Sequence, residues 1–187
     1  MQPRCALLFC TLLAWGVAGA DLTEQLDYTF YDVPVHKGAS LRELLAAASP
    51  VHVNGKVYHA YTRWNVNWHY HYLRRGDGRC GIDSVATQLT ATMTLPAPAD
   101  PALARDPLFV RYLAALRRHE QGHYEIGRNT ASSIDDGIFS LPAQDSCDAL
   151  AAAADALANA RLAGAREIEQ RYDRDTGFGR SQGAWLD

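Results

Sequence analysis

The sequence lacks a long apolar run outside its first residues, so we expect no membrane-spanning segment in the body of the chain. Apolar residues dominate only from Ala6 to Val17, a stretch too short for a spanning helix. Arg4 before this stretch and the small residues Ala18–Ala20 after it are typical of a secretory signal and its cleavage site. We therefore expect residues 1–20 to be a signal peptide and the protein to be periplasmic or secreted.

Cysteine is scarce once the expected signal is removed, because only Cys80 and Cys147 remain. Neither belongs to a Cys-x-x-Cys pair, which argues against a zinc site with cysteine ligands. In an oxidising compartment, the pair is expected to form one disulfide that closes the long loop between them.

The sequence also has no excess of Lys and Arg over Asp and Glu. The full chain carries 18 Lys and Arg residues against 21 Asp and Glu residues, and Arg4 leaves with the expected signal. The mature protein is therefore mildly acidic, without the basic footprint of a nucleic-acid-binding protein. We find no internal repeat and no disordered linker, so residues 21–187 are expected to form one domain.

The mature sequence divides near Pro96–Pro101 into a strand-rich front half and a helical back half. Ser40 and Glu43 form a capping box at the start of a short helix. Alternation over residues 60–72 predicts a long strand with His69 and His71 facing solvent on one side and Trp64 and Trp68 in the core on the other. Further strands are expected over residues 28–33, 51–57 and 85–95.

The feature that carries chemistry is His119-Glu-Gln-Gly-His123, an H-E-x-x-H motif. Two histidines four residues apart on a helix project from one face, so both imidazoles can reach one metal ion. In zinc peptidases, the glutamate of this motif is the general base that takes a proton from the attacking water. Glu120 is therefore the candidate catalytic residue.

A long helix is predicted around this motif, from a cap at Asp106 to an end near Asp135–Gly137. Gly122 lies in its middle, where glycine costs about 1 kcal/mol relative to alanine, which suggests that another group approaches the backbone there. A second helix is expected from Ser146 to Tyr172, followed by an irregular tail. One apolar face of the first helix contains both histidines, and its members are Leu108, Tyr112, Leu116, His119, His123, Ile126 and Thr130.

Four segments together form a longer pattern, namely His119–His123, Tyr172–Asp173, Thr176–Gly179 and Gln182–Gly183. This pattern closely resembles the bacterial family of predicted secreted zinc-dependent proteases, long catalogued as a domain of unknown function. The resemblance covers nearly all of the mature chain. It implies an α+β, zincin-like protease domain over residues 21–187, with a small antiparallel sheet packed on two long helices. The chain departs from the family at Phe178, where such proteins commonly carry histidine.

A catalytic zinc site usually has three protein ligands and one open position. The resemblance implies that Asp173 joins His119 and His123. The geometry of an antiparallel helix pair leaves other acidic and amide residues as alternatives for the third ligand. Asp155 and Asn159 would face the motif, Glu167 and Glu169 would lie roughly 10 Å further along, and Asp175 begins a segment that superficially resembles the aspartate-ligand signature of zinc peptidases.

These observations predict an exported metallopeptidase that binds Zn²⁺ through His119, His123 and Asp173 and uses Glu120 as general base. Its substrate would be a peptide or protein of the cell envelope. The alternative is a catalytically weak or inactive periplasmic zinc-binding scaffold. Phe178 favours the scaffold, whereas the intact Glu120 favours the enzyme.

Overall fold

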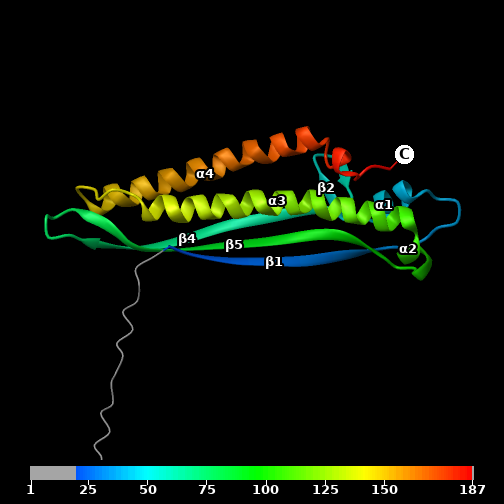
Figure 1. The fold of residues 1–187 in the computed structure, drawn as a ribbon, viewed down its shortest axis with the longest axis horizontal. Coiled ribbons are helices and arrows are strands. Elements are labelled where there is room, and N and C mark those ends of the chain that lie inside the picture. The colour runs from blue at the N-terminus through cyan, green and yellow to red at the C-terminus, as the bar shows by residue number, and fades with distance from the viewer. Residues whose placement is uncertain (1–19, 187) are drawn as a thin grey trace, which may run out of the picture.

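Three long strands form the base of the molecule, and two long helices are stacked above them (Figure 1). The computed structural model describes residues 20–186. The expected signal peptide lies outside these residues, apart from Ala20, which begins the first strand. No helix within residues 20–186 is long and apolar enough to cross a membrane.

The main sheet has the order β1-β5-β4, with β1 at Ala20–Val33, β4 at Tyr61–Arg74 and β5 at Cys80–Pro98. The expected antiparallel pairing is confirmed for β4 with β5, and for the small hairpin of β2 (Val51–Val53) and β3 (Lys56–Tyr58). β1 instead runs parallel to β5. The alternation pattern could not predict this direction, because it specifies which face of a strand is buried and not which way the strand runs.

α3 (Pro107–Phe139) covers one face of this sheet, and α4 (Cys147–Thr176) packs mainly on α3 (Figure 1). On β4, Thr62 and Val66 are buried, and Trp64 and Trp68 pack against the core, as the alternation predicts. His69 and His71, on the opposite face of β4, are exposed as expected. The remaining strand residues that complete this core are Leu22, Leu26, Tyr70, Ile82, Val85, Leu89 and Ala91.

Three helices begin where Ser40, Asp106 and Ser146 predict, the longest two run further than expected, and the short α2 was not predicted. α1 spans Leu41–Ala48 behind the predicted capping box, and a short α2 spans Pro101–Arg105. α3 spans Pro107–Phe139, and its first backbone N–H groups donate to the Asp106 carboxylate. α4 spans Cys147–Thr176, so the predicted irregular tail begins four residues too early. Asp173 is therefore a helical residue.

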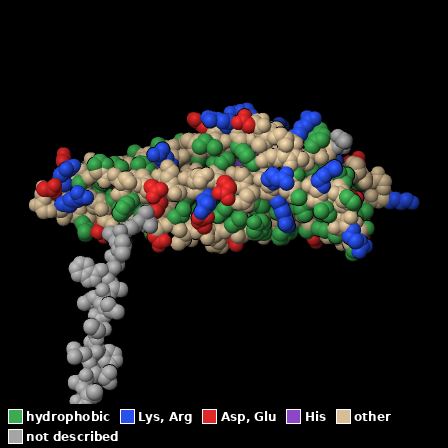
Figure 2. All heavy atoms as spheres, in the orientation of Figure 1, with side chains coloured by type: hydrophobic (Ala, Val, Ile, Leu, Met, Phe, Trp, Pro, Cys, Tyr) green, Lys and Arg blue, Asp and Glu red, His purple; other side chains and the backbone are tan. Residues whose placement is uncertain are grey.

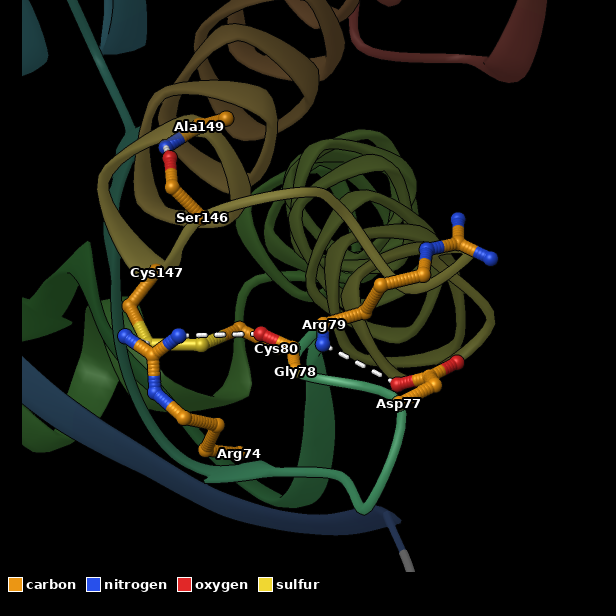
Figure 3. The surroundings of a disulfide bond; sticks show 8 residues. All are labelled: Arg74, Asp77, Gly78, Arg79, Cys80, Ser146, Cys147 and Ala149. Atoms are coloured by element: carbon orange, nitrogen blue, oxygen red, sulfur yellow. Dashed lines mark hydrogen bonds between the residues drawn. A yellow bond between two sulfur atoms is a disulfide. The ribbon is translucent and has the colours of Figure 1, made fainter.

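A disulfide joins the start of β5 to the start of α4 (Figure 3). Cys80 and Cys147 have Cα atoms 5.1 Å apart, which confirms the predicted pairing. Beside it, the backbone of Cys80 forms a reciprocal bridge with Gln144. The segment between α3 and α4 therefore continues along the molecule to reach β5 before α4 turns back.

This detour sets the register of the helix pair. His119 contacts Asp173, and His123 contacts Glu169. The midpoint of both pairs in the sequence is Ser146, the cap of α4, and not the end of α3. The prediction that Asp155 and Asn159 face the motif is therefore wrong. Asp155 instead lies close enough to Tyr70 to add to the effect of burial, which raises the pKa of that tyrosine.

Charged side chains are scattered over the elongated surface. In the view of Figure 2, Lys and Arg are interspersed with Asp and Glu, and neither sign forms a continuous stripe on this face. This distribution is in keeping with the balanced composition of the chain.

Candidate metal centre

α3 presents both histidines of the motif to α4. His119 and His123 are 6 % and 9 % exposed, which is low for imidazoles and places them among the buried residues of the helix. Their Nε2 atoms lie 3.3 Å apart. The one-turn spacing of the motif therefore brings two potential ligand atoms to a single point.

Asp173, from the last turns of α4, completes a group of three. Its Oδ1 lies 3.3 Å from Nε2 of His119 and 3.1 Å from Nε2 of His123. The structure therefore brings together the three residues that the family resemblance implies, and their ligand atoms lie within 4.8 Å of one another. Glu167 and Asp175 are exposed and do not belong to this group.

A closed chain of hydrogen bonds orients His119. The Tyr172 hydroxyl donates to the backbone carbonyl of His119 at 3.0 Å and accepts from Nε2 of Gln182 at 3.0 Å. This fixes the orientation of the Gln182 amide, because its nitrogen is the donor. Its Oε1 must then accept from Nδ1 of His119, 3.0 Å away. His119 consequently carries its ring proton on Nδ1.

His123 is oriented by a carboxylate. Its Nδ1 donates to Oε2 of Glu169, whose Oε1 accepts from the Trp64 indole N–H at 2.9 Å. Burial alone would lower the pKa of His123, but the hydrogen bonds to Asp173 and Glu169 outweigh it and raise the pKa to about 10. Burial likewise opposes ionisation of Asp173, but its contacts with the two histidines hold the pKa of this carboxyl well below its usual range.

These outer contacts determine which atoms remain for a cation. Both Nδ1 atoms are donors, so the two Nε2 atoms of neutral imidazoles would present lone pairs to each other and to the Asp173 carboxylate. Three electron-rich atoms at 3.1–3.3 Å repel unless a proton or a metal ion lies between them. A tetrahedral metal ion with bonds of about 2.0–2.1 Å holds its ligands roughly 3.3 Å apart, which is the spacing of this group.

Glu120 lies between the two histidines in the motif and is 4 % exposed. Its Oε2 is buried and has no hydrogen-bond partner among the described residues. Burial raises the pKa of this carboxyl above its ordinary value. An orphaned carboxylate oxygen beside a candidate metal site is suited to accept a proton from a molecule that enters the site.

Two glycines allow neighbouring groups to pack closely around His119. A Cβ at Gly122 would lie 2.0 Å from the Tyr172 hydroxyl oxygen, so this residue admits the tyrosine that stacks on His119. This confirms that another group approaches the helix backbone at Gly122. Gly179 has a φ of +82°, and a Cβ there would lie 3.1 Å from Cγ of His119.

The group borders an open cavity of about 840 Å³. Its walls come from α1, α3 and α4, from the β2–β3 hairpin, from the start of β4 and from the C-terminal segment. Phe178 lines the wall and contacts the ring of Tyr58 instead of entering the metal group. A ligand that enters this cavity therefore has access to Glu120 and to the three candidate ligands.

The sequence did not predict the roles of Glu169 and Gln182. The expectation that Glu169 lies roughly 10 Å beyond the motif is wrong, because Glu169 contacts Nδ1 of His123, the ring nitrogen away from Asp173. Gln182 belongs to the family pattern, but no local spacing relates it to His119. Both roles depend on the helix register and on the return of the tail, which are properties of the folded chain.

Two histidines from one helix, with a carboxylate from its neighbour at the wall of a cavity, define this α+β domain as one with a candidate metal centre. A comparison with family models identifies a match over residues 28–179. The chain belongs to the family described as "Bacterial protein of unknown function (DUF922)". No curated protein and no solved structure matches the chain significantly.

Proposed function

We propose that this chain is an exported, zincin-like zinc metallopeptidase. The observation that carries the proposal is the convergence of His119 Nε2, His123 Nε2 and Asp173 Oδ1, with both Nδ1 atoms already engaged as donors. Two imidazoles and one carboxylate are a donor set that catalytic zinc sites use, with a further position left for water or substrate. His119, His123 and Asp173 would hold the ion.

A zinc ion held there would supply Lewis-acid chemistry, by polarising a peptide carbonyl and lowering the pKa of water. Glu120 then takes a proton from the attacking water and passes it to the leaving amine. Its burial supports this role, because a carboxylate with a raised pKa is a stronger base than one in bulk water. Glu169 and Gln182 keep the imidazoles oriented during these steps.

Strand β4 supports a peptide as the substrate. It is an edge strand of the main sheet, and its first residues, Tyr61 and Thr62, line the cavity. An extended peptide can add to such an edge through backbone hydrogen bonds. The Thr62 hydroxyl donates to the backbone carbonyl of Glu120 at 3.1 Å, so the edge and the base are held together.

The central test compares zinc content with hydrolysis in Glu120→Gln. We expect about one zinc per chain in the wild type and in the variant, because Glu120 is not a ligand. Hydrolysis of a peptide library should fall by at least about a hundredfold, since general-base assistance typically contributes 10²–10⁴. Glu125→Gln, on the more exposed side of the same helix, is the matched control and should retain activity.

Three results would contradict this proposal in different ways. Absence of zinc from carefully expressed wild type would remove the metal centre. Loss of zinc in Glu120→Gln would mean that Glu120 is a ligand. Full hydrolysis in a zinc-loaded Glu120→Gln would exclude it as the base.

The scaffold alternative rests on Phe178, which has a φ of +54° and an exposed ring at the cavity wall. Phe178→His restores the residue that is common in the resembling family. If the wild type binds zinc without hydrolysing peptides and this variant gains hydrolysis, the scaffold reading of the wild type is correct. Equal hydrolysis by both would show that Phe178 is compatible with catalysis.

A further inference from the structure

The cavity has a second polar end, away from the metal group. Arg42, His59, Tyr112 and Trp185 line this end. Tyr112 lies seven residues before His119 on α3, which is roughly 10 Å along the helix axis at 1.5 Å per residue. A ligand that spans the cavity can therefore contact both ends.

Arg42 supplies positive charge at this end. Its guanidinium lies 5.2 Å from the centroid of the Trp185 ring, and the guanidinium of Arg180 lies 4.0 Å from the same ring. Among the described residues, no carboxylate forms an ion pair with either arginine. A guanidinium stacked on an aromatic face keeps N–H groups at its edge, and these match the geometry of a carboxylate.

Hydrogen bonds join the neutral residues beside Arg42. His59 Nδ1 lies 2.8 Å from the Tyr112 hydroxyl, and the Tyr31 hydroxyl donates to the His59 carbonyl at 2.8 Å. Burial, and then the charge of Arg42, lower the pKa of His59, while burial raises the pKa of Tyr31 to about 12. The charge of Arg42 therefore acts on His59, and the acidic residues that line the cavity, Glu120, Glu169 and Asp173, belong to its metal end.

Glu120, Glu169 and Asp173 line the metal end and offset the two positive charges that a zinc ion would bring. Arg42 forms no ion pair with a carboxylate of the described residues, so a substrate carboxylate is attracted towards it. An extended peptide spans about 3.3–3.6 Å per residue, so roughly 10 Å corresponds to about three residues. The two ends together favour one orientation of a substrate whose carboxylate lies a few residues from the cleaved bond.

We propose that Arg42, supported by Trp185, is a specificity-determining residue that binds a carboxylate of the substrate. The inference rests on the proposed function, because it assigns a substrate class to the same cavity. The carboxylate comes either from the C-terminus of a peptide or from an Asp or Glu side chain within about three residues of the cleaved bond.

The test measures binding in Glu120→Gln, so that the peptides stay intact. Three probes are titrated by calorimetry: acetyl-tetraalanine with a free C-terminus, its C-terminal amide, and the amide of acetyl-Ala-Ala-Glu-Ala. We expect at least one carboxylate probe to bind about tenfold or more tightly than the uncharged amide, as a charge-assisted hydrogen bond provides. The stronger of the two carboxylate probes identifies the source.

The arginine is tested by adding a second substitution. Arg42→Gln should abolish the preference for a carboxylate and Arg42→Lys should retain part of it. Arg111→Gln, on the exposed face of α3 outside the cavity, should leave the preference unchanged. Melting temperatures of all variants establish that each remains folded.

Equal binding of all three probes to the Glu120→Gln protein would overturn the proposal. So would a preference that survives Arg42→Gln, because the carboxylate would then be bound at the metal end. These outcomes are separable from failure of the proposed function. A protein without zinc or hydrolysis can still show a preference that depends on Arg42, and an active peptidase can lack it.

Discussion

The two ends of the α3–α4 pair use the same helices in different ways. Near the disulfide, the helices meet through aliphatic and small side chains, as where Leu157 packs over Gly137. Near the metal group, they meet through imidazoles, carboxylates and the Tyr172 ring. The first end is closed and apolar, whereas the second borders a cavity of about 840 Å³.

This difference indicates that one end of the helix pair provides stability and the other end forms the site. Apolar contacts and a covalent link at one end hold the helices in register, so the other end can keep buried polar groups that would be costly alone. Stability and site geometry should therefore respond to different substitutions. The predictions below are ordered from the largest expected effect to the smallest.

Removal of the disulfide should cause the largest loss of stability and leave the site intact. Cys80 and Cys147 are 67 residues apart in the sequence. The chain-entropy model gives a loss of about 4 kcal/mol in the free energy of unfolding for a loop of this length. Denaturant titration of Cys80→Ser/Cys147→Ser would measure it. Zinc content of the folded fraction should stay at the wild-type level, and its loss would show that the two ends are not independent.

Substitution of two glycines compares a closely packed position at the metal end with a position on α4 where an added Cβ would contact nothing. Gly122→Ala places a Cβ 2.0 Å from the Tyr172 hydroxyl oxygen, so the tyrosine must move from His119. We expect a destabilisation of about 1–3 kcal/mol from overpacking, together with weaker zinc binding. Gly164→Ala meets no atom within 4 Å and should stabilise α4 by up to about 1 kcal/mol.

Thermal melts and metal titrations of both glycine variants provide the comparison. A Gly122→Ala protein with wild-type zinc affinity would show that the contact between Tyr172 and His119 does not support the site. A destabilised Gly164→Ala would reveal a contact at that position in the folded protein.

Glu169→Gln tests the orientation of His123 without removing a proposed ligand. The neutral amide is a weaker acceptor for the Nδ1 proton, and substitutions of such partners typically lower metal affinity about 10–100-fold. Glu167→Gln, two residues earlier and exposed, should have no effect. Competition with a chelator measures both affinities. Complete loss of zinc would instead identify Glu169 as a direct ligand.

Local features of this site could be predicted from the sequence, whereas its long-range contacts could not. The motif helix, its Asp106 cap and the close approach at Gly122 follow from spacing and backbone chemistry within a few residues. The contact between His123 and Glu169 depends on where α4 begins relative to α3. That offset is set by the Cys80–Gln144 bridge and the disulfide, which connect segments distant in the sequence.

The same distinction between local and long-range features applies to the prediction of the fold. Alternation identified β4 and β5, because each residue's face depends only on its neighbours. The parallel direction of β1 required knowledge of the whole intervening path. α4 also runs past Tyr172 to a cap at Gly177, where φ is +57°, and this glycine could have indicated a longer helix.

The last prediction contrasts the half-buried Asp173 with the buried Asp135. At the metal end, contacts with histidines lower the pKa of Asp173. Near the disulfide end, burial raises the pKa of Asp135, which accepts a hydrogen bond from Thr87 at 2.7 Å. Because the folded-state pKa of Asp135 lies above that of an unfolded aspartate, about 4, its ionisation opposes folding increasingly as the pH rises through and above that value.

Asp135→Asn removes this charge and keeps an oxygen that accepts from Thr87. We expect the variant to be more stable than the wild type at pH 7, by about 1 kcal/mol or 2–4 °C in Tm. The gain should shrink as the pH falls below about 4, because Asp135 is then protonated in both folded and unfolded wild type. Thermal melts across this range measure the difference. A lower Tm for the variant at pH 7 would mean that the charged carboxylate stabilises the fold, and the contrast with Asp173 would then be lost.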